Sequence, residues 1–392
     1  MKHDIQVSQA KRLFELMDRR TTDLAPSVMT QPVADYVCHD LAACERAVLF
    51  RRLALLIALG CELPRPGDYL CDDFSGMPIV VRRCEDGSVA AWRNVCSHRG
   101  ARLLNGRGSS PERLTCPYHA WTYAADSGRL LAVPFERGFE EIDTGCLGLV
   151  PLPVREIHGL IFAVPEPGVE LDADRFLEEV GDDLAQFGLE GYHHFETRVL
   201  EQPLNWKLVV DTFLETYHLG TLHRSTIAPI LHSNLSTFTP MGRHLRMIAA
   251  RRSIEQLRTQ PECEWDLVRH SAMVYVIFPN TVFIMQGDHL ETWRVYPGAS
   301  PDASRMHVSL YTPEPACSES AVRHWRKNLD LLMATVLEED FPLAADMQRD
   351  FSVRNDHLLF GRNEPALQHF HRMLHDALRN SIGERDDRGR EE

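Results

Sequence analysis

The sequence predicts an α+β fold made of two domains, a small all-β module followed by a larger mixed domain. Two observations support this prediction. Short β-like runs separated by turn signals fill the region from about residue 45 to 165. After the Pro- and Gly-containing segment 165–168, apolar strand patterns and long helical patterns occur together as far as about residue 383.

The first 44 residues are expected to form N-terminal helices that pack on the larger domain. Residues 8–20 read as an amphipathic helix that Ser8 can cap, with an apolar stripe at Leu13, Phe14 and Met17. A second helix is expected over residues 40–58. The opening residues contain no apolar signal region, so the sequence predicts a cytoplasmic protein.

The β module, residues 45–165, is expected to consist of short strands joined by tight turns. Turn-forming dipeptides at Gly67-Asp68, Ser75-Gly76 and Asp86-Gly87 separate the apolar runs. The expected strands cover residues 69–71, 77–81, 89–92 and 159–164.

The larger domain, residues 166–383, alternates between segments with helical periodicity and segments with strand periodicity. Helical patterns occur at residues 174–187, 203–217, 318–340 and 364–378, and strand patterns occur at 273–278, 281–285, 292–296 and 306–311. The charged segment 384–392 is expected to be a disordered tail.

Composition excludes several classes of protein. A chain of 392 residues with 44% hydrophobic and 25% charged residues is typical of a soluble globular protein. A formal net charge of -14 argues against a nucleic-acid partner, and the apolar run 53–59 is too short to span a membrane. The ten scattered Cys favour free thiols in a reducing compartment.

Charge is distributed unevenly along the chain. Residues 84–130 contain six Arg and four acids, a local excess of positive charge. This window is a candidate docking surface for an acidic electron donor, and the alternative is that these Arg make loop hydrogen bonds.

Two Cys-His pairs lie within the β module. Cys96-Ser97-His98 is followed after seventeen residues by Cys116-Pro117-Tyr118-His119. Two Cys and two His are the ligands of a Rieske [2Fe–2S] cluster, in which the Cys hold one iron and the His hold the other. Zinc is the alternative metal, although in zinc fingers two Cys usually precede two His.

A second set of metal-ligand types lies in the segment 205–223. Asp211, Glu215 and His218 are spaced i, i+4 and i+7, which would place them on one face of a helix. Polar side chains on such an apolar helix are expected to be paired or bound to a metal. The alternative for Glu215 is a surface pair with Lys207 or Arg224.

His218 and His223 can meet at one metal only if the helix ends between them. Five residues apart on an unbroken helix, they would diverge by about 140°. Gly220 supplies a break. Two imidazoles and one carboxylate would form the facial triad of a non-haem Fe(II) oxygenase.

The motifs 94–100, 116–123 and 205–223 together resemble the signatures of Rieske non-haem iron oxygenases, specifically the α (terminal oxygenase) subunit. The resemblance covers residues 45–375 and departs at Ala120, where the family usually has Gly. It implies a Rieske domain joined to a catalytic domain of the helix-grip type. It also implies that Cys96, His98, Cys116 and His119 bind the cluster.

The resemblance further implies a mononuclear iron held by His218, His223 and a distant carboxylate. Asp340 in the stretch 337–341 aligns with that ligand, and Glu338, Glu339 and Asp346 are the alternatives. Glu215 corresponds to the carboxylate that bridges the ligand His to a cluster His of the neighbouring subunit. Glu at this position is similar to the choice in carnitine- and choline-type members.

The implied function is a terminal oxygenase that uses O2 to hydroxylate a small organic substrate, aromatic or quaternary-ammonium in type. Monooxygenation, dioxygenation and oxidative demethylation all stay open. Electrons would come from an external reductase or ferredoxin, and inter-subunit relay implies a homotrimer or a multiple of three. The chain has no dinucleotide-binding Gly fingerprint, so NAD(P)H would act only through the reductase.

Two alternative functions are a Rieske-type electron-transfer protein without oxygenase activity and a zinc-binding protein that is not an enzyme.

Residues on the downstream strands could line a pocket or an aromatic cage for an ammonium group, although each is individually more typical of a core: Tyr275, Phe278, Phe283, Met285, Trp293 and Tyr296. Another His cluster, His369, His371 and His375, is expected to be packing or surface residues.

Overall fold

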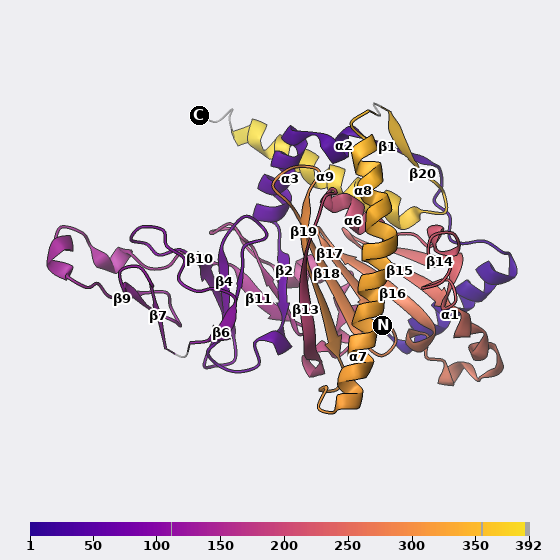
Figure 1. Ribbon diagram of the computed structural model, residues 1–392, viewed down its shortest axis with the longest axis horizontal. Coiled ribbons are helices and arrows are strands. Elements are labelled where there is room, and N and C mark those ends of the chain that lie inside the picture. The colour runs from indigo at the N-terminus through magenta and orange to yellow at the C-terminus, as the bar shows by residue number, and fades with distance from the viewer. Residues whose placement is uncertain (111, 354–355, 389–392) are drawn as a thin grey trace. The chain divides into compact units, whose positions relative to one another are not determined.

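The computed structural model describes residues 1–110, 112–353 and 356–388 and confirms the α+β fold (Figure 1). The chain divides into two compact units. The larger unit contains Met1–Leu49 and Glu178–Glu392, and the smaller unit contains Phe50–Leu177.

The smaller unit is built from three antiparallel sheets. One has five strands in the order β10-β5-β4-β3-β6, and two have three strands in the orders β11-β12-β2 and β7-β8-β9. The strands are β2 (Leu55–Leu59), β3 (Asp68–Asp72), β4 (Ile79–Arg83), β5 (Val89–Arg93), β6 (Arg107–Ser109), β7 (Arg113–Thr115), β8 (Thr122–Ala124), β9 (Leu130–Ala132), β10 (Pro151–Leu152), β11 (Val154–Ile157) and β12 (Leu160–Ala163). The unit ends in α4 (Ala173–Leu177).

One predicted helix is wrong at its C-terminal end. The helix expected over residues 40–58 ends at Arg52 as α3 (His39–Arg52), and the next apolar residues form β2. Every residue of β2 is buried. A short, uninterrupted apolar run carries no periodicity that distinguishes a buried strand from a helix, which explains the error.

The larger unit is organised around a seven-stranded antiparallel sheet in the order β13-β19-β18-β17-β16-β15-β14. Its strands are β13 (His193–Gln202), β14 (Leu231–Met241), β15 (His244–Arg251), β16 (Ser271–Ile277), β17 (Thr281–Met285), β18 (Leu290–Pro297) and β19 (Ser304–Thr312). A separate two-stranded sheet pairs β1 (Met29–Pro32) with β20 (His357–Phe360).

Helices cover this seven-stranded sheet. Figure 1 shows α7 (Glu319–Thr335) and α8 (Phe341–Asp350) as one rod in front of it, joined by a π-helical turn at Val336–Asp340. The remaining helices of the unit are α1 (His3–Asp18), α2 (Ala34–Val37), α5 (Gly181–Ala185), α6 (Trp206–Asp211) and α9 (Pro365–Arg388). Among them, α1 contacts β14, and α9 contacts β14 and β15.

Several helical predictions differ from the structure in their extent. The first helix, predicted over residues 8–20, begins at His3, so Ser8 does not cap it. Residues 174–187 form two short helices, α4 and α5, and residues 203–217 form only the six-residue helix α6. At the C-terminal end, α9 extends through Arg388, and the last four residues of the predicted tail lie outside the described residues.

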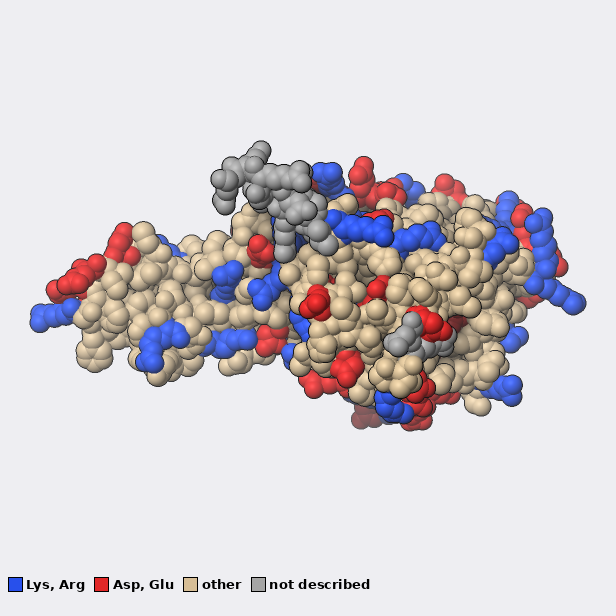
Figure 2. All heavy atoms as spheres, turned by 90° about the horizontal axis from the view of Figure 1, so that it is seen from above, with Lys and Arg blue, Asp and Glu red and all other residues tan. Residues whose placement is uncertain are grey.

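Several Arg of the positively charged window 84–130 already have partners. Arg102 pairs with Asp73 at 3.3 Å, and Arg107 pairs with Glu62. On the face drawn in Figure 2, acidic and basic side chains are interspersed. These pairs agree with the loop-contact alternative for those two Arg. No helix in the described part of the chain has both the length and the apolar character needed to cross a membrane.

Candidate metal centres

The two Cys-His loops of the smaller unit repeat one backbone arrangement. The N–H of Cys96 and of Cys116 each donates to the carbonyl five residues later, at 2.8 Å in both loops. Each Cys carbonyl accepts from the N–H four residues later, at 3.0 Å, which places Gly100 and Ala120 at equivalent positions. Both have positive φ, 76° for Gly100 and 56° for Ala120. Because this conformation costs a non-Gly residue about 1–2 kcal/mol, Ala120 carries backbone strain that Gly would not.

The loops bring the four predicted cluster ligands together. Cys96 and Cys116 are buried in one core cluster, and the rings of His98 and His119 lie 4.6 Å apart between centroids. The Nδ1 atom of His98 is buried without a hydrogen-bond partner in the described residues. An imidazole nitrogen without a partner is typical of a ligand atom, and together with two buried thiols in one core cluster it fits a [2Fe–2S] cluster.

Side chains around the loops hold the ligands in place. Trp121 stacks on His98 at 4.7 Å with an interplanar angle of 7°. The Tyr123 hydroxyl lies 3.0 Å from the Cys96 sulfur and 2.9 Å from the Ser97 hydroxyl. Burial and the contact with Cys96 raise the pKa of Tyr123 to about 12, so it stays protonated and is able to donate to the sulfur.

In the larger unit, Asp211, Glu215 and His218 do not share a helix face, and this prediction is wrong. Helix α6 ends at Asp211, and His218 begins a separate 3₁₀ turn, His218–Gly220. Asp211 pairs with His371 at 2.9 Å and accepts from the Tyr36 hydroxyl at 2.8 Å. Asp211 therefore has partners from distant segments and does not face Glu215 and His218 along one helix.

The break in the helix nevertheless brings three side chains to one point. His218 Nε2 and His223 Nε2 lie 3.1 Å apart, and Asp340 Oδ1 lies 3.1 Å from the second and 3.7 Å from the first. His223 and Asp340 are buried, and His218 is partly buried. Together these three residues could hold one metal ion. Two imidazoles and one carboxylate suit Fe(II).

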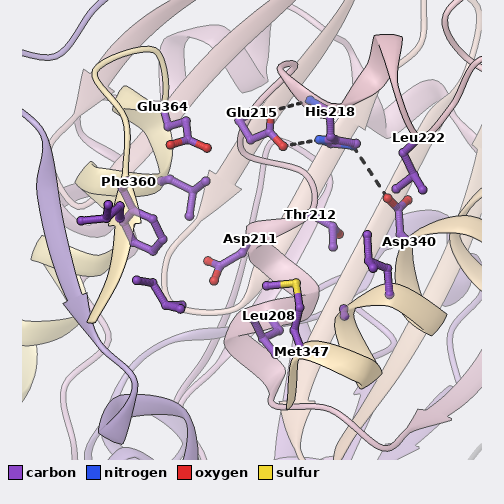
Figure 3. Close-up of a pocket in the computed structure, with 15 residues that line it drawn as sticks. Leu208, Asp211, Thr212, Glu215, His218, Leu222, Asp340, Met347, Phe360 and Glu364 are labelled. Carbon is purple, nitrogen blue, oxygen red and sulfur yellow. Dashed lines mark hydrogen bonds and ion pairs between the residues drawn. The ribbon is translucent and has the colours of Figure 1, made fainter. Parts of the chain in front are cut away.

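A carboxylate holds the outer nitrogen of each His. Glu215 pairs with His218 Nδ1 and also accepts from the backbone N–H of His218 at 3.1 Å (Figure 3). Glu339 lies 2.5 Å from His223 Nδ1 and accepts from the Thr226 hydroxyl at 2.7 Å. Such partners fix the tautomer of a neutral His and leave Nε2 free for a metal. Burial opposes a charge on His223, yet its bonds to Asp340 and Glu339 raise its pKa.

The geometry separates Asp340 from the other acids considered as third ligand. Glu338 and Asp346 are exposed, and Asp346 pairs with Arg349. Glu339 lies on the outer side of His223, as described above. The wider π-helical turn at Val336–Asp340 carries both Glu339 and Asp340 onto the same imidazole.

The surface-pair alternative for Glu215 does not describe this structure. Lys207 is buried and bonds Glu45 at 2.5 Å, and Glu215 bonds His218 instead. The other His cluster packs as predicted, with acids from distant segments that the sequence did not indicate. His371 pairs with Asp211, and His375 pairs with Asp35 at 2.7 Å.

Two cavities meet at the triad. The larger has a volume of 410 Å³, is drawn in Figure 3 and is lined by Asp211, Phe360 and Glu364. Burial raises the pKa of Glu364. The smaller, 110 Å³, lies against the seven-stranded sheet and is lined by side chains such as Phe213, Met247, Val274, Ile284 and Glu291. Glu215, His218 and Asp340 line both.

The six downstream side chains are core residues, as the sequence favoured for each of them, and the cage alternative is not supported. None of the six side chains proposed for it lines either cavity, and all six are buried in the core. Tyr275 and Phe283 pair across β16 and β17 and pack on Phe187. Phe213, just beyond α6, lines the smaller cavity instead.

Comparison with known families agrees with this pair of centres. A model of the Rieske [2Fe-2S] domain matches residues 55–147, and a model of the ring hydroxylating alpha subunit (catalytic domain) matches residues 189–380. The chain belongs to the Rieske oxygenase alpha subunits. Members of this family hold a Rieske [2Fe–2S] cluster and a mononuclear iron, and the residues of both centres fit these groups.

Similar curated proteins are oxygenase components. The chain is 34% identical to the carnitine monooxygenase oxygenase subunit of Acinetobacter pittii over 50% of this chain and 52% of that protein. It is 36% identical to the glycine betaine monooxygenase oxygenase subunit of Chromohalobacter salexigens over 46% of this chain and 40% of that protein. It is 27% identical to the biphenyl 2,3-dioxygenase subunit alpha of Rhodococcus jostii over 84% and 72%. The chain thus spans about half the length of the first curated relatives it matches.

Solved structures show the same fold over most of the chain. The quaternary ammonium Rieske monooxygenase CntA with L-carnitine has a TM-score of 0.76 at 22% identity, covering 91% of this chain and 96% of that one. Naphthalene 1,2-dioxygenase from Rhodococcus sp. has a TM-score of 0.67 at 17% identity, covering 95% of this chain and 98% of that one.

Proposed function

We propose that this chain is the terminal oxygenase of a multicomponent system that oxygenates a small organic substrate with O2. The observation that carries the proposal is the convergence of His218, His223 and Asp340 between two cavities, with both outer imidazole nitrogens held by carboxylates. This centre and the Cys-His loops occur in one chain. O2 activation requires both a cluster that supplies electrons and an iron that has open positions.

The proposed cluster ligands are Cys96 and Cys116 for one iron and His98 and His119 for the other. Two buried thiols, which would bind as thiolates, and a ring pair at 4.6 Å support this assignment. An external reductase or ferredoxin is the proposed electron donor. Because such a donor draws on NAD(P)H, we infer a cytoplasmic location.

The proposed mononuclear ligands are His218, His223 and Asp340. Bound Fe(II) would supply the activation of O2 at the positions that the triad leaves open. Glu215 and Glu339 bond the Nδ1 atoms and so orient both imidazoles with Nε2 toward the metal position. The mainly apolar wall of the smaller cavity excludes water from the reacting substrate.

Glu215 has a second proposed role as the bridge through which an electron arrives from the cluster of a neighbouring subunit. This relay would require a head-to-tail ring, most simply a homotrimer. Exposed apolar side chains, Leu343, Met347 and Leu359, line the cavity that Glu215 also lines. Such a surface suits coverage by another protein.

The proposed substrate class is a small quaternary ammonium compound, and the support comes from the names of the carnitine and glycine betaine relatives. An aromatic substrate is the second candidate, supported by the biphenyl dioxygenase relative. The 110 Å³ of the smaller cavity suits a small substrate of either class.

The experiment that tests this function follows O2 uptake by the reconstituted protein with a reductase. We expect Glu215→Gln to keep the cluster absorbance and the bound iron while losing most of the O2 uptake. Glu338→Gln, an exposed acid near the triad, is the matched control and should behave as the wild type. An electron carrier without oxygenase activity would instead show no O2-dependent product in any variant.

A further inference from the structure

A row of four side chains crosses the sheet at the smaller cavity. Met247, Val274, Ile284 and Glu291 stand opposite one another on β15, β16, β17 and β18. All four line the cavity that the metal triad also lines. Because cross-strand partners share a face, Glu291 places a carboxylate in an otherwise apolar row.

The carboxylate of Glu291 is buried and only partly satisfied. The residue is 3% exposed. Its Oε1 lies 3.2 Å from His289 Nε2, and its Oε2 has no hydrogen-bond partner within the part of the chain that the structure describes. A buried carboxylate oxygen without a partner is costly, so its persistence beside a cavity indicates a ligand that satisfies it.

Glu291 shares one charged neighbour, His289, with Asp288, and a second, Arg251, bonds Gln286. His289 also pairs with Asp288 at 2.7 Å; burial opposes its charge, but the two carboxylates raise its pKa to about 9. Asp288 is a surface group that also faces His324. Arg251 donates to the carbonyl and the side-chain oxygen of Gln286, both at 2.9 Å.

We propose that Glu291 binds the cationic group of the substrate and thereby selects small organic cations over neutral molecules of the same shape. The proposal rests on the proposed function, because it takes the smaller cavity as the substrate site. A cation beside an ionised carboxylate in a water-poor cavity gains far more than it would in water. The 110 Å³ volume limits the occupant to a small molecule.

Two probes of the same shape test the charge preference. Choline and its neutral carbon analogue 3,3-dimethylbutan-1-ol would be titrated calorimetrically into the anaerobic protein loaded with cluster and iron. We expect choline to bind at least about tenfold more tightly than the analogue. In Glu291→Gln, which keeps the side-chain shape, we expect the ratio to fall to within about twofold.

Two further variants keep the test interpretable. Glu291→Asp retains the charge and should retain a preference for choline. Glu201→Gln makes the same chemical change at an exposed acid on β13 of the same sheet and should leave the ratio unchanged. Cluster absorbance and circular dichroism would confirm that each variant is folded.

Binding is measured without turnover, so the two proposals fail separately. A protein that prefers choline but shows no O2 uptake would contradict the oxygenase function and leave the role of Glu291 standing. The role itself is overturned if neither probe binds, if both bind equally to the wild type, or if Glu291→Gln keeps the tenfold preference.

Discussion

Replacing Glu339 by Gln removes the carboxylate charge that holds the outer nitrogen of His223 while keeping the shape of the side chain. Glu339 lies 2.5 Å from His223 Nδ1, and the Thr226 hydroxyl donates to the same carboxylate oxygen at 2.7 Å. Loss of such a partner typically costs 10–100-fold in metal affinity. Since a Gln oxygen can still accept from the imidazole, we expect about tenfold for Glu339→Gln, or about 1.4 kcal/mol. For Glu339→Ala we expect about 100-fold, or about 2.8 kcal/mol.

The assay is anaerobic competition for Fe(II) against a chelator of known affinity, on protein whose cluster is intact. Glu338→Gln changes the preceding acid, which is exposed, and serves as the control. We expect it to bind Fe(II) as the wild type does. Affinities of Glu339→Gln and Glu339→Ala within twofold of the wild type would refute the reasoning, as would an equal loss in the control.

Three further predictions concern stability. Glu45→Gln should lower the free energy of unfolding by about 3–5 kcal/mol in urea denaturation, because it leaves the buried ammonium of Lys207 unpaired; an unchanged midpoint would contradict this. The pKa of His289 is raised from 6.5 to about 9 in the folded protein. Protonated His289 therefore adds about 3 kcal/mol to the free energy of unfolding below pH 6.5, and this stabilisation is lost as pH rises through 9. The stability difference between wild type and His289→Gln should therefore shrink over that range, and a constant difference would argue against it. Ala120→Gly should raise the free energy of unfolding of the cluster-containing protein by up to about 1 kcal/mol, and Gly100→Ala should lower it by about 1–2 kcal/mol, both followed by thermal melting; equal effects of the two would contradict the shared loop geometry.

The cluster loops could be predicted from sequence because their geometry is local. Cys96 and His98 are two residues apart, and the turn at Gly100 that shapes their loop lies within the same segment. The same holds for His218 and His223, which meet because the chain turns at Gly220 between them.

Features that depend on contacts between distant segments could not be predicted from the sequence. Asp211, the last residue of α6, bonds Tyr36 and His371, which lie 175 and 160 residues away along the chain. Glu291 enters the cavity through cross-strand register, which spacing along one strand does not reveal. Strand alternation is consistent with Tyr275 and Phe283 on one face of the sheet. It does not reveal on which face of the sheet the cavity lies.

Iron and acid-labile sulfide per chain, measured after full anaerobic reconstitution of wild type and His223→Ala, test the two-centre account most directly. We predict about three irons and two sulfides in the wild type, and about two of each in His223→Ala with an unchanged Rieske absorbance. A wild type that takes up only two irons, or a His223→Ala variant that keeps three, would contradict the account.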